Sequence, residues 1–208
     1  MKRKPSLFSR LGQIMLAMAL LSGLSVGVSA CARTGITTLA DRTPKLDLPT
    51  FFAGQTVALG IFEDRFGNLR RQFRVVLEGM VDGDVLTLDE TFLYDDGEQD
   101  FRKWVIRRAG MGRDGEVLYE GSAEDITGVA SGAISGNALN WEYDVVLSID
   151  GRNVEVHFDD WIYQQHEDVA INRAYVSKFG IEIGSVTIVF LRGDAADAIS
   201  PLDLKRWS

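Results

Sequence analysis

Residues 137–164, NALNWEYDVVLSIDGRNVEVHFDDWIYQ, alternate between apolar and polar side chains on both sides of a central Asp150-Gly151 pair. The apolar series of the first half is Leu139, Trp141, Tyr143, Val145 and Leu147. A period of two residues is typical of antiparallel strands that have one buried and one solvated face. Because Asp-Gly readily adopts the positive φ of a tight turn, the stretch predicts a hairpin of two long strands.

The same pattern recurs along the chain from Phe51 onward. Turn pairs such as Asp82-Gly83, Asp96-Gly97 and Asp114-Gly115 follow one another about every dozen residues, close to the spacing of an all-β sandwich or barrel. We predict about ten strands, at residues 55–65, 68–79, 84–94, 98–109, 116–125, 127–134, 137–149, 152–163, 169–178 and 182–192. A meander of this length must curl or split, so we expect an all-β, antiparallel up-and-down barrel, with a two-sheet sandwich as the alternative.

The first thirty residues have a different character. A basic start, which includes Lys2 and Arg10, precedes an apolar run that ends in small residues. This order is typical of a secretory signal. The residues Val28-Ser29-Ala30-Cys31 resemble the bacterial lipobox, which implies that Cys31 is acylated and becomes the new N-terminus. A transmembrane anchor with an incidental cysteine is the alternative, although the run is near the lower length limit for a span.

The predicted organisation follows from these features: a signal peptide over 1–30, an acylated N-terminus and tether over 31–50, a β-barrel domain over 51–192 and a C-terminal tail over 193–208. Ala32 is not the aspartate that retains enterobacterial lipoproteins in the inner membrane, so we expect an outer-membrane lipoprotein that faces the periplasm. Without residues 1–30 the chain carries 18 Lys and Arg against 30 Asp and Glu. We therefore expect membrane contact through the lipid on Cys31 and not through the protein surface.

Composition also excludes several functional classes. The acidic balance argues against a nucleic-acid partner, which would need a basic face. The single cysteine excludes an internal disulfide, and with two histidines it is too few for a Cys/His zinc cage. No nucleophile motif or phosphate loop is visible either. From composition and motifs together we expect no metal, no cofactor and no catalytic residue. We predict no particular protein partner.

Several strings resemble a family of Gram-negative lipoproteins known only as a domain of unknown function. They are Glu78-Gly79 followed by Asp82-Gly83, Tyr94-Asp95-Asp96-Gly97-Glu98, Phe158-Asp159-Asp160-Trp161 and Ile171-Asn172-Arg173. The resemblance spans about residues 45–192 and implies a lipoprotein domain without an assigned activity. The strand meander also resembles the lipocalin and fatty-acid-binding superfamily in architecture, although function taken from fold alone is analogy.

The densest group of polar candidates lies in the last strands and contains Asp160, Trp161, Asn172 and Arg173. Alternation places Asp160 on the apolar face of its strand, where a carboxylate needs a partner. Arg173 is the partner that we expect, because its guanidinium matches a carboxylate in two hydrogen bonds. The pair could anchor a ligand head group or could be a structural ion pair.

Glu90 also belongs to an apolar series, in the strand predicted over 84–94. If it points inward, Arg102 on the next strand could meet it, or a ligand could. A bulge that turns Glu90 outward is the alternative.

These observations lead to three hypotheses about function. The first is a non-enzymatic lipoprotein whose barrel binds or carries a small amphiphilic molecule, with Glu90, Asp160, Trp161, Asn172 and Arg173 as ligand-binding residues. The second is a structural or assembly partner whose barrel is filled by its own side chains. The third is a small enzyme with an Asp/Arg/Asn site. A cavity of a few hundred Å³ would separate the first from the second.

Overall fold

The computed structural model describes residues 35–149 and 152–207 of the 208-residue chain. All ten predicted strands are present, and each runs antiparallel to its neighbours. Their bounds are β1 Gly54–Asp64, β2 Leu69–Asp82, β3 Val85–Tyr94, β4 Gln99–Met111, β5 Val117–Ser122, β6 Ile126–Ser135, β7 Ala138–Ile149, β8 Arg152–His166, β9 Val169–Lys178 and β10 Ile181–Arg192.

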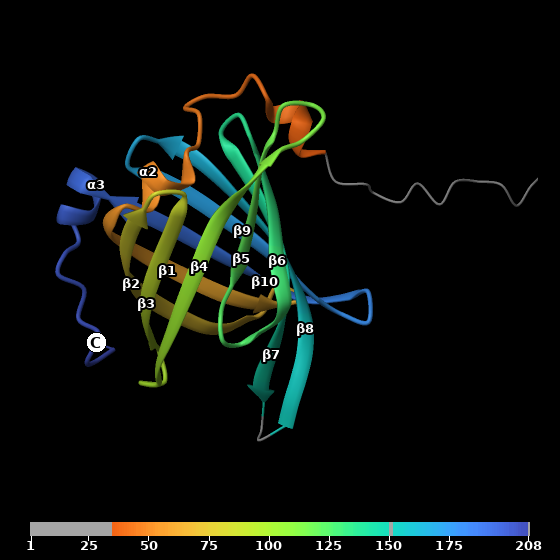
Figure 1. Cartoon of the computed structure of the whole chain (residues 1–208). Helices are drawn as coiled ribbons and strands as arrows, with labels where there is room; N and C mark the ends of the chain where they lie inside the picture. The colour runs from red at the N-terminus through yellow and green to blue at the C-terminus, as the bar shows by residue number, and fades with distance from the viewer. Residues whose placement is uncertain (1–34, 150–151, 208) are drawn as a thin grey trace, which may run out of the picture. The chain divides into compact units, whose positions relative to one another are not determined.

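The sheet closes into a barrel (Figure 1). Each strand pairs with the next one in the sequence, and β1 pairs with β10 from Thr56↔Arg192 to Asp64↔Gly184. Closure leaves no free edge and confirms the predicted up-and-down barrel over the sandwich alternative. The expected hairpin of residues 137–164 is β7 and β8, which pair from Ala138↔Tyr163 to Ile149↔Arg152.

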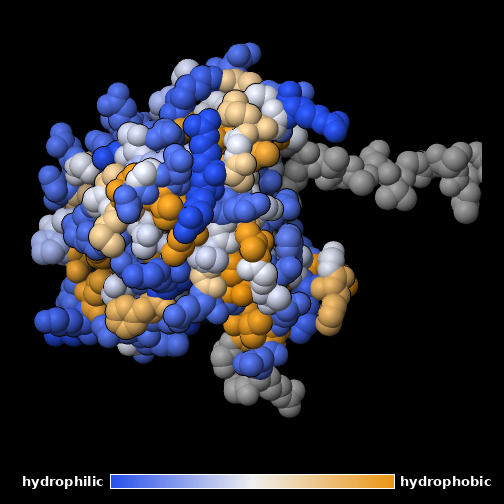
Figure 2. Space-filling model, in the orientation of Figure 1, coloured by the Kyte–Doolittle hydropathy of each residue, from blue (hydrophilic) through white to orange (hydrophobic). Residues whose placement is uncertain are grey.

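Strand alternation separates a buried inner face from a mainly polar outer face. Val75, Leu77 and Leu88 point into the barrel and are at most 5% exposed, as the period of two predicts. Figure 2 shows mostly hydrophilic side chains on the visible outer surface, with apolar patches over the lower ends of β7 and β8 and at the β9–β10 turn. The core of the domain is therefore the interior of the barrel.

A short helix closes one end of the barrel. The helical segments are η1 Ile36–Leu39, α2 Leu48–Phe52 and α3 Gly193–Asp197. Asp47 caps α2 by accepting a hydrogen bond from the Thr50 N–H at 3.0 Å. The buried side chains of Leu48, Phe51 and Phe52 fill this end. Residues 46–50, which composition assigns to a tether, thus belong in part to the core.

Gly79 permits the close approach of α2 to β2. A Cβ at this position would lie 1.7 Å from the Phe52 carbonyl oxygen, so only glycine fits beneath the helix. The backbone of α2 therefore packs directly on the backbone of β2 at Gly79.

The C-terminal tail lies along the outer face of β2, β3 and β4. Arg74 Nη1 donates to the Asp203 carbonyl at 3.2 Å, and the Trp207 ring lies 4.4 Å from the Arg74 guanidinium carbon. Gln99 donates to the Leu204 carbonyl. Leu93, which points outward between these strands, is 0% exposed.

Residues 35–208 form one compact unit that contains the whole barrel. The buried core residues lie between Leu46 and Ala196, so the unit holds every element that it needs to fold on its own. In the described part of the chain, no helix combines the length and the apolar character needed to cross a bilayer.

Candidate functional site

The barrel encloses a cavity of about 390 Å³. At the α2 end it is bounded by Leu48 and Phe52. At the opposite end it is lined by Arg71 and Asp100, and Asp100 is exposed to solvent, so the cavity opens there. The aromatic side chains of its wall are Phe62, Phe73, Phe92, Tyr94, Trp104, Trp141, Tyr143, Phe158 and Phe190.

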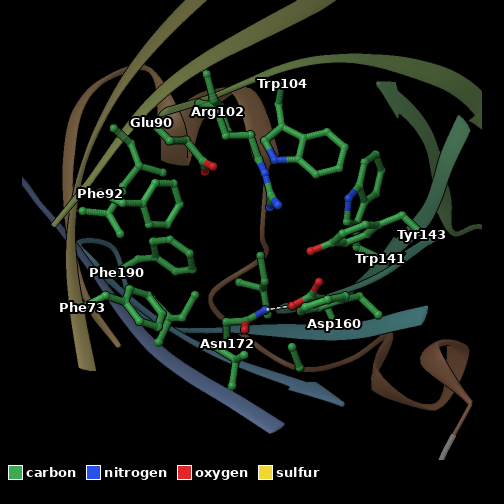
Figure 3. Close-up of a pocket in the computed structure, with 18 of the residues that line it drawn as sticks. Phe73, Glu90, Phe92, Arg102, Trp104, Trp141, Tyr143, Asp160, Asn172 and Phe190 are labelled. Carbon is green, nitrogen blue, oxygen red and sulfur yellow. Dashed lines mark hydrogen bonds between the residues drawn. The ribbon is translucent and has the colours of Figure 1, made fainter. Parts of the chain in front are cut away.

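One polar group in the cavity lies on β3 and β4. Glu90 and Arg102 are direct cross-strand partners, and both side chains line the cavity (Figure 3). Arg102 forms an ion pair with Asp125, which lies in the connection between β5 and β6. Glu90 therefore points inward, which decides between the two orientations that the sequence allows.

A second polar group lies on β7, β8 and β9. Asn172 Nδ2 donates to Asp160 Oδ1 at 2.8 Å, and the Tyr143 hydroxyl donates to the same carboxyl. In Figure 3 the Tyr143 hydroxyl and the Arg102 guanidinium both extend into the space between the two groups. The strands thus direct a small set of polar side chains into an otherwise apolar cavity.

Burial changes the acid–base properties of these groups. Desolvation raises the pKa of Glu90 to about 7, against the opposing effect of Arg102. Desolvation likewise raises the pKa of Asp160 to about 6, although the hydrogen bonds from Asn172 and Tyr143 oppose it. For Arg102, burial disfavours the charge, but the neighbouring Tyr143, Glu90 and Asp125 outweigh it, so its pKa is raised. The cavity therefore holds carboxyl groups that titrate near neutral pH.

Two of the predicted ligand-binding residues lie on the outer wall. Trp161 is buried there against Tyr163, with ring centroids 6.1 Å apart. Arg173 is the register partner of Trp161, donates to Thr187 Oγ1 at 2.6 Å and lies 3.5 Å from Glu63. The expected Asp160–Arg173 ion pair is therefore wrong. Glu90, Asp160 and Asn172 do line the cavity.

We refer to the two polar groups together as the polar cluster: Glu90, Arg102, Asp125, Tyr143, Asp160 and Asn172. The sequence did not predict two of its members. Tyr143 stood in the apolar series of its strand, and a buried hydroxyl that needs a partner was the available signal. Asp125 lies in a turn where no periodicity applies, and nothing in the sequence marks it. Arg102 was considered only as a partner of Glu90, whereas its ion pair is with Asp125.

Polar groups outside the cavity form smaller clusters. His157 Nδ1 lies 2.9 Å from Asp144 Oδ1 on the exposed side of the barrel. Among the residues that the structure describes, no group of three or more His, Cys, Asp or Glu side chains could hold a metal ion. Cys31 and the predicted signal peptide lie outside the described residues.

Comparison with known proteins gives a family and solved structures of similar fold. A family model described as "Protein of unknown function (DUF3833)" matches residues 25–192. No curated protein sequence matches the chain. Among solved structures, the S-type phycobiliprotein lyase CPES from Guillardia theta is similar, with a TM-score of 0.46 and 10% sequence identity, over 72% of this chain and 94% of that chain.

Proposed function

We propose that this chain, which belongs to the DUF3833 family of proteins of unknown function, binds a small molecule with an apolar body and one polar group inside its barrel. The observation that carries the proposal is the cavity of about 390 Å³, a size within the range of small-molecule sites. Its aromatic wall suits an apolar body, and the inward-facing Glu90, Arg102, Asp160 and Asn172 suit one polar group.

The cavity argues against the hypothesis of a filled barrel. A barrel whose own side chains occupied the interior would leave no space of this size. Ala174 and Ala170 point inward from β9 and are almost fully buried. Their small side chains fill little of the interior and leave room for a ligand. We therefore place binding ahead of a purely structural role.

An enzymatic role is the second candidate, and the raised pKa values favour it. Groups whose pKa lies near the working pH are typical of general acids and bases, and Glu90 and Asp160 share one cavity. Burial alone also explains both shifts, so binding without chemistry remains our first choice. An unchanged mass of the bound molecule after incubation would argue against catalysis.

Lipid anchoring is the cellular part of the proposal. The order of basic start, apolar run and Val28–Cys31 supports a lipoprotein that is acylated at Cys31. We propose that the barrel faces the periplasm from the outer membrane, where lipid-like amphiphiles are available as ligands. Two acyl groups on the N-terminal residue would be enough for stable anchoring.

Native mass spectrometry of residues 35–208, purified without denaturation, tests the binding proposal. We expect a co-purified amphiphile, or retention of an added one, by the wild-type domain. Ala174→Phe adds a ring to the cavity wall and should abolish retention, whereas Val146→Phe on the exposed side of β7 should not. Equal retention by the two variants would contradict binding inside the barrel.

A further inference from the structure

The side-chain oxygen of Asn172 is a buried acceptor without a partner. Asn172 is 3% exposed and lines the cavity. Its Nδ2 is committed to Asp160, because an ionised carboxylate can only accept a hydrogen bond. The Oδ1 atom then accepts from no described protein group. Buried polar atoms are nearly always paired in native proteins, so this oxygen marks a place for a donor from a bound molecule.

Glu90 adds a second acceptor. Its carboxyl lines the cavity, and no hydrogen bond to it is found among the described residues. Its cross-strand partner Arg102 directs Nη2 to Asp125 instead. Glu90 and Asn172 Oδ1 therefore both offer acceptors to a ligand, and Arg102, whose Nη2 is paired with Asp125, is the one cationic donor that the described residues place beside them.

The charges in the cluster have the same bias. Three carboxyl groups, those of Glu90, Asp125 and Asp160, lie near the guanidinium of Arg102, and Tyr143 is uncharged. The second arginine of the cavity wall, Arg71, is already paired with Asp96 and Glu98 at the open end. A carboxylate ligand would add a fourth negative group where water is largely excluded. A cationic ligand would instead offset the excess of acids.

We propose that the cavity selects a ligand whose polar group donates hydrogen bonds, and that it prefers an ammonium group to a hydroxyl and either of them to a carboxylate. This inference rests on the proposed binding function and names the ligand class. Glu90 and Asn172 Oδ1 are the acceptors, Asp160 holds Asn172 in place, and the aromatic wall takes the alkyl chain. Burial is the largest cause of the raised pKa of Glu90, and repulsion from Asp125 and Asp160 adds to it; this repulsion supports a preference for a cationic group over a further anion.

Three ligands of equal chain length test the proposal: decylamine, decanol and decanoic acid. Each is titrated into residues 35–208 at pH about 8, where the acid is ionised and the amine is charged, at concentrations below self-association. Trp104 and Trp141 line the cavity, so their fluorescence reports binding directly. We expect decylamine to bind at least about tenfold more tightly than decanoate, with decanol between them.

Two variants locate the preference. Glu90→Gln removes a charge and should reduce the ratio of the decylamine affinity to the decanoate affinity about tenfold. Asn172→Leu should also reduce this affinity ratio while an alkyl ligand is still bound. Arg173→Gln, on the outer wall, is the control and should leave the ratio unchanged.

The outcomes are distinct. If decanoate binds as tightly as decylamine, the inference is wrong and the binding proposal stands. If none of the three ligands binds, the proposed function fails, and the inference fails with it. A preference for amine that Glu90→Gln and Asn172→Leu both leave intact would also overturn the inference.

Discussion

Asn172 on β9 donates a hydrogen bond to Asp160 on β8, with 2.8 Å between Nδ2 and Oδ1, and both side chains face the cavity. The two residues are diagonal neighbours on the inner face of the sheet, since Asp160 lies opposite Ala174 and Asn172 lies opposite Ile162. The interior of the barrel thus satisfies a buried carboxyl with a neutral amide and not with a cation.

The first prediction contrasts two neighbours on β9. Asn172→Ala removes a donor from a buried carboxyl and should lower the free energy of unfolding by about 1–3 kcal/mol. Arg173→Ala removes a partly exposed ion pair and should cost less than about 1 kcal/mol. Urea unfolding measures both. A double-mutant cycle should show coupling of Asp160 with Asn172 and none with Arg173; the reverse result would reject the register described here.

The choice between Asn172 and Arg173 shows where sequence reasoning stops. Neighbouring residues of a strand face opposite sides, so only one of the two could point inward. In β9 both faces mix polar and apolar side chains, and small Ala170 and Ala174 occupy the inner one. A register shift between Gln164 and His166 lies between the β8–β9 turn and Asp160, so counting residues from the turn could not decide which residue of β9 meets Asp160.

Where apolar side chains occupy only one face of a strand, the sequence was enough to predict which side chains point inward. β7 places Leu139, Trp141 and Tyr143 inside as predicted, and turn glycines marked nearly every strand end. The closing helix α2 was missed because five residues are too few to show a period of 3.6. Its docking depends on Gly79, whose role is visible only when β2 and α2 are brought together.

The second prediction concerns that contact. Gly79→Ala places a Cβ against the Phe52 carbonyl, so α2 must move, and the free energy of unfolding should fall by about 1–3 kcal/mol or more. Gly35→Ala is the matched control, because a Cβ there meets nothing within 4 Å. Thermal unfolding of both variants checks this. Equal melting temperatures would mean that α2 does not pack on β2 in solution.

The third prediction concerns the C-terminal tail. Deletion of residues 200–208 uncovers Leu93, which is 0% exposed in the intact chain, and should cost about 1.5–3 kcal/mol. Loss of the contact between Arg74 and Trp207 adds to this. Lys205→Ala changes an exposed side chain of the tail and should have little effect. Urea unfolding that does not distinguish the deletion from the intact chain would show that the tail is not bound.

The fourth prediction tests the lipid anchor. Cys31→Ala removes the thiol that would carry the diacylglycerol, so the protein should leave the membrane fraction of cells. Metabolic labelling with a palmitate analogue should mark the wild-type chain only. Fractionation of a cavity variant such as Ala174→Phe should match wild type. Label on the Cys31→Ala protein would argue against lipidation at Cys31.

The last prediction uses the titration of Glu90. Its pKa is about 7 in the folded protein against an ordinary 4.5, so between these values the folded state binds more protons than the unfolded chain. Stability from this group is therefore fully present below pH 4.5 and is lost as pH rises through 7. The loss is at most about 3.5 kcal/mol, since one pKa unit corresponds to about 1.4 kcal/mol. Asp160, with a pKa of about 6, adds a fall of the same sign from pH 3.8 upward.

Glu90→Gln isolates the contribution of this one carboxyl. We expect the variant to lose less unfolding free energy than wild type between pH 4.5 and 7, because glutamine stays neutral in both states. Glu120→Gln, on the exposed side of β5, should keep the wild-type dependence. Urea unfolding at several pH values supplies the comparison. If wild type and Glu90→Gln fall in parallel across this window, Glu90 is ionised at low cost, and water must reach it freely inside the barrel.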